Sequence, residues 1–161
     1  MQYKAEIFDE FQYLYEITGF SDHQVHCVIS FESTVDAMLM KKAAELLIRT
    51  VPILSRTYQN RGGKSYWEDT VSESCSDLFT ITDSKAEFDE FSVSKTDEAL
   101  GPQIKFCLLQ SNTDELSVVI NHMVSDAAGF KQCIYLFSDI YSKLIKNPCY
   151  VPDYIIDGDR G

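Results

Sequence analysis

The stretch of sequence that decides the fold reads Val118-Val119-Ile120-Asn121-His122-Met123-Val124-Ser125-Asp126-Ala127-Ala128-Gly129. Its aliphatic start predicts a buried strand that ends at His122. Asp126 stands four residues later, where a helix is expected to begin near Ala127. The arrangement would hold an imidazole at a strand end, where a substrate can reach it. Histidine suits proton transfer near neutral pH because its ordinary pKa is about 6.5.

Taken alone, these residues leave two interpretations open. In the first, His122 is a satisfied histidine at a strand end and Asp126 is a capping residue, without chemistry. In the second, His122 is a general base whose neutral form is favoured by the positive N-terminus of the following helix. Asp126 then either caps that helix or pairs with a cation that fixes the turn.

Working outward, the sequence alternates between strand and helix periods. Strand patterns cover residues 23–31, 53–59, 65–68, 78–82, 103–109 and 115–121, with a glycine turn between the second and third. Helical patterns cover 7–17, a segment capped by Ser33 or Thr34 that runs to Val51, and a final helix from Ala127. The segment 83–98 is interpreted as a solvated acidic stretch. Helices interleaved with hairpins predict an α/β fold in which helices cover a mixed, largely antiparallel sheet.

Composition excludes several classes of function. The chain has 161 residues and a formal net charge of −11, which argues against a nucleic-acid binder. No signal peptide or membrane span is visible, so a reduced cytoplasm is the expected compartment. The five cysteines form no CxxC pair, and no metal site is expected. The aromatic residues Phe8, Phe11, Tyr13 and Tyr15 are interpreted as the core and rim of the first helix.

Residues 121–127 also resemble a known motif, the HHxxxDG sequence of the chloramphenicol-acetyltransferase-like superfamily. This group includes condensation domains of non-ribosomal peptide synthetases, alcohol acetyltransferases and plant acyl-CoA-dependent acyltransferases. The flanks are similar to the first half of such proteins, over about residues 8–150. They comprise the Val35-Asp36…Leu39…Ala43 helix, Val51-Pro52-Ile53-Leu54 before a strand with Arg56, and Gly101-Pro102-Gln103-Ile104-Lys105-Phe106. Asn121 replaces the first histidine, which departs from the form most typical of condensation domains, and Ala127 replaces the glycine.

The resemblance implies an acyltransferase of the alcohol-acetyltransferase type, which moves an acyl group from an acyl-CoA thioester to an alcohol or amine. His122 would be the general base, and Asp126 would be structural and paired with an arginine, for which Arg56 is the candidate. Asn121 and Gly129 are neighbours in the motif. Acyl-CoA, or a phosphopantetheine thioester, would be a co-substrate, and no bound cofactor is implied. Two alternatives remain, a condensation domain that uses carrier-protein thioesters and a non-catalytic binding module that keeps the fold.

The resemblance also implies a domain organisation. Proteins of this superfamily consist of two similarly folded halves with the active-site channel between them. Residues 1–161 are therefore interpreted as one N-terminal subdomain without its C-terminal half, either a truncated form or a naturally free-standing half. We expect the isolated chain not to turn over acyl-CoA. We also expect the face left open around His122 to pair with a second copy, as a two-fold dimer.

Overall fold

The computed structural model describes residues 1–69 and 77–157, and its main element is a four-stranded sheet. The strand order is β2 (Gln24–Ser30), β7 (Glu115–Asn121), β6 (Ile104–Leu109), β5 (Phe79–Thr82). The first three strands pair antiparallel, and β5 pairs parallel with β6. Strands β6 and β7 are buried along almost their whole length, which explains their nearly continuous apolar sequences.

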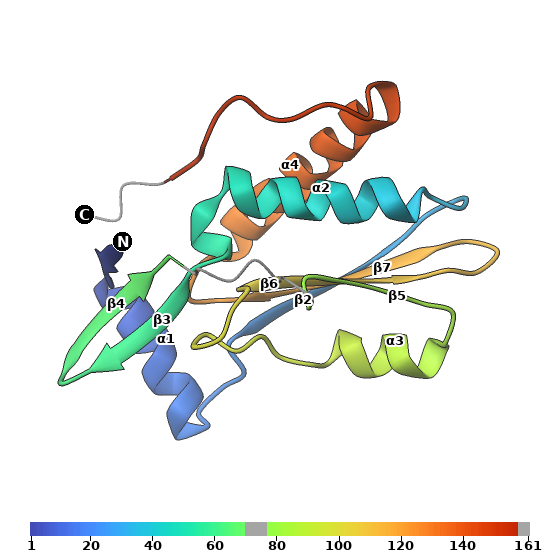
Figure 1. Ribbon diagram of the computed structural model, residues 1–161. Coiled ribbons are helices and arrows are strands. Elements are labelled where there is room, and N and C mark those ends of the chain that lie inside the picture. The colour runs from blue at the N-terminus through green and yellow to red at the C-terminus, as the bar shows by residue number, and fades with distance from the viewer. Residues whose placement is uncertain (70–76, 158–161) are drawn as a thin grey trace.

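Helices cover both faces of this sheet (Figure 1). Helices α2 (Ala37–Thr50) and α4 (Ala127–Lys146) pack together on one face, and α3 (Lys85–Ser92) lies on the other. The buried residues of α4 recur at helical spacing and include Phe130, Phe137, Ile140 and Leu144. The ring of Phe137 stacks on Phe106 of β6 at 5.0 Å between centroids. The predicted α/β class, with helices over a mixed and mostly antiparallel sheet, is confirmed.

Helix α3 lies within the acidic stretch 83–98, where no helix was predicted. The acidic side chains of the helix are exposed, in agreement with a solvated stretch. Ser84 caps the helix by accepting a hydrogen bond from the Glu87 amide. Phe88 is buried and Phe91 is partly buried, and both pack in a small cluster with Cys107 and Leu109 of β6. Two aromatic residues three positions apart are enough to seat a two-turn helix whose other side chains are mostly charged.

A second, smaller sheet has the order β1 (Gln2–Lys4), β4 (Lys64–Glu68), β3 (Thr57–Arg61) and is antiparallel throughout. The predicted hairpin between β3 and β4 is confirmed, with positive φ at both Gly62 and Gly63. The short 3-10 helix η1 (Pro52–Leu54) precedes it. Strand β1 was not predicted, because three residues carry no periodicity and depend on their pairing with β4.

Helix α1 (Ile7–Thr18) lies beside the small sheet and ends at Gly19, whose φ of 67° closes the helix. Its existence was predicted, but the burial of its aromatic residues was not. Phe8, Phe11 and Tyr15 are exposed, and Tyr13 is only partly buried. The interpretation of these rings as core and rim holds for Tyr13, which packs against the core, and was wrong for the other three, because α1 turns its polar side toward the protein.

The cap of α2 is Asp36, which accepts from the Leu39 amide at 2.9 Å, and not Ser33 or Thr34. After α4 the chain runs back along α2 toward the N-terminus, as Figure 1 shows, and the Ile156 amide donates to the Thr50 carbonyl at 2.7 Å. Within the described ranges, no helix has the length and apolar character that crossing a membrane requires.

Candidate functional site

His122 stands where β7 leaves the sheet, and its backbone is fixed by the segments on either side. The His122 amide donates to the His23 carbonyl at 2.8 Å, just before β2 begins. One residue earlier, the Asn121 amide donates to the Gln103 carbonyl at 2.8 Å, just before β6. The residues that precede β2 and β6, the two strands beside β7, therefore hold the backbone at His122. This support gives the His122 backbone the rigidity that a catalytic side chain needs.

Asn121 closes the turn that follows the strand. Its side chain is buried, and its amide oxygen accepts a hydrogen bond from the Met123 backbone at 2.9 Å. This two-residue link is a typical Asx turn. The chain thus turns at His122, whose imidazole is half-buried.

His122 faces an open hollow of about 510 Å³. The hollow is lined by Glu6, Phe8, Asp9, His122, Met123, Val124, Ser125, Asp126 and Gly129. The Phe8 ring of α1 lies 5.9 Å from the imidazole, measured between ring centroids. The Nδ1 atom of His122 is buried and has no hydrogen-bond partner among the described residues. A buried polar atom without a partner is uncommon and marks a place where water or a ligand is expected.

Asp126 caps α4 instead of reaching across the fold. Its Oδ1 accepts a hydrogen bond from the Gly129 amide at 2.7 Å, and the side chain is exposed. A Cβ at position 129 would lie 2.7 Å from the Ser125 hydroxyl oxygen and 3.4 Å from Asp126 Oδ1. Gly129 therefore lets the cap and the Ser125 side chain approach the first turn closely. The sequence left two roles open for Asp126, a helix cap and an ion pair with a cation. In the structure Asp126 is the cap of α4.

Arg56 does not pair with Asp126, and this expectation was wrong. The Arg56 guanidinium is 4% exposed and donates from Nε to Asp69 at 2.9 Å. Its other two nitrogens form a fork with the Asp157 carboxylate at 2.9 and 3.0 Å. The Tyr3 ring covers its face, 3.6 Å from the guanidinium carbon. Because β4 and the C-terminal segment bring two carboxylates to Arg56, its donors are directed there and the Asp126 carboxylate stays with its own helix.

This cluster is held in its charged form. Burial works against the charge of Arg56, but its hydrogen bonds with Asp157 and Asp69 outweigh that effect and raise the pKa of Arg56. Burial likewise works against ionisation of Asp69, while hydrogen bonds from Arg56 and the N-terminal amine outweigh it and lower the pKa of Asp69. Because the folded pKa is the lower one, the contribution of Asp69 to stability is present near neutral pH. This contribution is lost only in acid, as the pH falls below the ordinary pKa of 3.8 and then through the lowered pKa of Asp69 in the folded protein.

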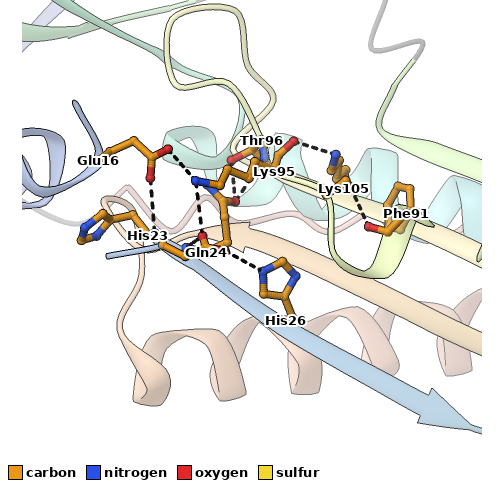
Figure 2. Close-up of polar contacts among 10 residues, drawn as sticks. Glu16, His23, Gln24, His26, Phe91, Lys95, Thr96 and Lys105 are labelled. Atoms are coloured by element: carbon orange, nitrogen blue, oxygen red, sulfur yellow. Dashed lines mark hydrogen bonds and ion pairs between the residues drawn. The ribbon is translucent and has the colours of Figure 1, made fainter. Parts of the chain in front are cut away.

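Sequence reasoning missed a second histidine next to the site. His23 is buried, its Nε2 lies 3.1 Å from the Ser21 hydroxyl, and its ring stacks on Tyr15 at 5.7 Å. Burial lowers the pKa of His23, and the nearby Glu16 carboxylate opposes the shift without cancelling it. In Figure 2, Glu16 lies between His23 and Lys95. No motif marks His23, because its place beside His122 depends on the pairing of β2 with β7.

The thiols of Cys107 and Cys133 are not candidates for a nucleophile. Burial raises the pKa of Cys107 and of Cys133 to about 11, so both are protonated at neutral pH. Their interpretation as small core residues agrees with this, and Cys75 lies outside the described residues. In residues 1–69 and 77–157, no three His, Cys, Asp or Glu side chains are grouped to hold a metal ion.

No protein-family model matches the sequence, and no curated protein matches it. Solved structures do match, over most of this chain. One is the epimerization domain from the third module of tyrocidine synthetase B, with a TM-score of 0.75 and 19% identity over 98% of this chain. Another is polyketide synthase associated protein 5 from Mycobacterium tuberculosis, with a TM-score of 0.72 and 15% identity over 96% of this chain.

A variant of the starter condensation domain of rhizomide synthetase RzmA, solved in complex with C8-CoA and Leu-SNAC, also matches. Its TM-score is 0.76 and its identity 11%, over 91% of this chain. The chain spans only 38%, 35% and 36% of these three structures, respectively. Identities this low support a shared fold, and the shared fold covers a little over a third of each larger protein.

Proposed function

We propose that this chain, which has one half of the chloramphenicol-acetyltransferase-like fold, forms half of an acyltransferase with His122 as its general base. The observation that carries the proposal is the position of His122. Its backbone is held by hydrogen bonds at a strand end, and its imidazole faces a 510 Å³ hollow. The Phe8 ring forms an apolar wall beside the imidazole. A proton-transfer group needs this combination of rigid support and access.

The chemistry follows from a neutral imidazole. As an acceptor hydroxyl or amine attacks the carbonyl carbon of an acyl thioester, His122 takes the proton that the acceptor loses. The tetrahedral intermediate then collapses, the carbon–sulfur bond breaks, and the imidazolium returns the proton to the departing thiolate. The products are an ester or amide and a free thiol, with no covalent bond to the protein. A general base contributes about 10²–10⁴-fold to such a step.

Asp126 acts on this step through the backbone. By capping α4 it fixes the first turn of the helix, and this turn carries Gly129 and borders the hollow. Its carboxylate hydrogen-bonds the Gly129 amide, so the proposal gives it no part in orienting the His122 ring. Asp126 is therefore a positioning residue.

The acyl donor is a thioester of coenzyme A or of a carrier-bound phosphopantetheine. We place acyl-CoA first, because Asn121 replaces the histidine that the condensation-domain form of the motif carries. Asn121 here closes a turn through Met123. Among the residues that line the hollow, Glu6 and Asp126 are exposed acidic residues, Asp9 is buried with its carboxylate bonded to Trp67, and none is a lysine or arginine. The hollow therefore favours a neutral or cationic acceptor.

The experiment is a thiol-release assay on a protein that joins this chain to a second half of the fold. Acetyl-CoA and octanoyl-CoA are offered as donors with an alcohol and an amine as acceptors, and the chain alone is the control. We expect thiol release from the joined protein and none above buffer from the chain alone, because orientation of both substrates supplies about 7–11 kcal/mol. Absence of release from the joined protein with every donor, carrier-bound thioesters included, would contradict the proposal.

A further inference from the structure

Helix α1 has its amphipathic character inverted. Its buried side carries Asp9 and Gln12, which are 1% and 9% exposed. Its outer face, which we define as Ile7, Phe8, Phe11, Leu14 and Tyr15, is between 40% and 73% exposed. A surface helix of an isolated globular protein normally places these two sets the other way round. The outer α1 face therefore has the composition of a protein interior. Phe8 and Tyr15 contact His122 and His23 at its edge, whereas Ile7, Phe11 and Leu14 are at least half exposed.

Specific contacts hold the helix in this orientation. Asp9 accepts a hydrogen bond from the indole nitrogen of the fully buried Trp67 at 2.9 Å. At the other end of the helix, Glu16 accepts from Lys95 Nζ at 2.8 Å, a contact drawn in Figure 2. Rotating the apolar side inward would break both contacts and leave Trp67 without its acceptor. The exposure is thus built into the fold.

The outer α1 face, together with the neighbouring side chains of Phe20 and Ile17, is large enough to form an interface. A whole aromatic side chain can bury about 150–250 Å², so the rings of Phe8, Phe11, Tyr15 and the adjacent Phe20 together expose roughly 400 Å². This already reaches the range of the largest apolar patch on a typical monomer, about 300–600 Å². With the exposed parts of three aliphatic residues, Ile7, Leu14 and Ile17, the surface approaches the roughly 800 Å² that each partner buries in a stable complex.

The spacing of the face favours a second helix of the same kind. Ile7, Phe11 and Leu14 follow one another at intervals of four and three residues, which is the spacing of side chains that interdigitate between two packed helices. A second copy offers the same pattern on the same surface, and two identical apolar faces satisfy each other across a two-fold axis. We propose that the outer α1 face is a dimer interface in which α1 packs against α1 of a second copy.

The interface would also border the candidate site. Phe8 belongs to the outer α1 face and to the wall of the His122 hollow. A second copy on α1 would cover the α1 side of that hollow. The association itself does not depend on the proposed acyl transfer, so the two proposals can fail separately.

Charge sets the conditions under which the dimer forms. Each copy carries a formal charge of −11, so two copies repel one another at long range. Glu16 lies on the inner side of α1, where it is paired with Lys95, and the five residues that define the outer α1 face are uncharged. Salt screens the long-range repulsion and leaves the apolar contact intact. Dimerisation should therefore strengthen as NaCl rises from 50 to 500 mM, opposite to an interface held by ion pairs.

Light scattering and sedimentation equilibrium test this on the chain of residues 1–161. We expect a dimer at micromolar concentration, and the double variant Phe11→Gln/Leu14→Gln should raise the dissociation constant at least about tenfold. The matched control, Tyr135→Gln/Ile145→Gln, changes equally exposed apolar residues on α4 and should leave the constant unchanged. Far-UV circular dichroism verifies that every variant is folded.

Three outcomes would overturn the proposal. A wild-type monomer at every salt concentration would mean that another polypeptide covers the outer α1 face. A dimer that survives in the α1 variant would place the interface elsewhere. A dimer that weakens with added salt would mean that charged contacts hold it. Hydrogen exchange adds a second readout, since the α1 amides should become protected on dimerisation in wild type and not in the α1 variant.

Discussion

Replacing Arg56 by methionine tests how the C-terminal segment is held to the fold. The substitution keeps an apolar stem and removes the guanidinium that joins Asp69, Asp157 and the Tyr3 ring. The C-terminal segment then retains the hydrogen bond from Ile156 to Thr50 and loses its charged anchor. We expect a lower free energy of unfolding and local release of this segment.

The magnitude follows from the contacts. Three charge-assisted hydrogen bonds at about 1.5–3 kcal/mol each set an upper limit of roughly 5–9 kcal/mol. Asp69 and Asp157 are 45% and 40% exposed, so water replaces most of what they lose. The variant also escapes the cost of burying a charge. Loss of the contact with Tyr3 adds about 0.5–2 kcal/mol. The net loss should be about 2–3 kcal/mol, or roughly 5–10 °C in Tm for a chain of this size.

Urea denaturation followed by circular dichroism measures this loss, and hydrogen exchange at the Ile156 amide measures the local release. The control is Arg61→Met, because Arg61 is exposed on the same hairpin and bonds only Gln59 among the described residues, at 3.3 Å. The control should change stability by less than about 0.5 kcal/mol. If Arg56→Met were as stable as the control and kept the Ile156 amide protected, the reasoning about this cluster would be refuted.

Three further predictions concern the site. Asp126→Ala should lower the free energy of unfolding, measured in urea, by about 1 kcal/mol, and Asp126→Asn by only about a few tenths, because asparagine caps a helix equally well. A loss of about 3 kcal/mol in either variant would indicate a buried ion pair instead. Gly129→Ala should destabilise more in wild type than in a Ser125→Ala background, which removes the hydroxyl 2.7 Å from the new methyl group; equal Tm changes would contradict this contact. The folded pKa of His23 is lowered by burial, so stability should fall as the pH drops below 6.5 and level off below the folded value. His23→Gln should flatten that part of the Tm profile and the half-exposed His26→Gln should not; an unchanged profile in His23→Gln would contradict the assignment.

Much of the main layer could be predicted because its sequence is dominated by burial. Strands β6 and β7 carry long apolar sequences, and α4 repeats its buried residues at helical spacing. The hairpin of β3 and β4 was marked by its two glycines. The motif residues were also located correctly relative to β7 and α4, since their positions depend only on local order along the chain.

What sequence reasoning missed depends on contacts between distant segments. The helical period of α1 was visible, but the inward direction of Asp9 depends on Trp67, 58 residues away. The partners of Arg56 lie 13 and 101 residues further along the chain. The position of Arg56 relative to the motif does not indicate which carboxylates the fold brings to it. Helix α3 was hidden because the burial of Phe88 and Phe91 is supplied by β6.

The central claim, that His122 is a general base, is tested most directly by the acyl-transfer rate of His122→Ala in the protein that contains both halves. The account predicts that kcat falls about 10²–10⁴-fold, while the Tm changes little because the imidazole is half-buried and its Nδ1 has no partner among the described residues. Asp126→Asn, measured alongside, should keep most of the rate because the cap survives. A His122→Ala protein that transfers acyl groups at the wild-type kcat would contradict the account.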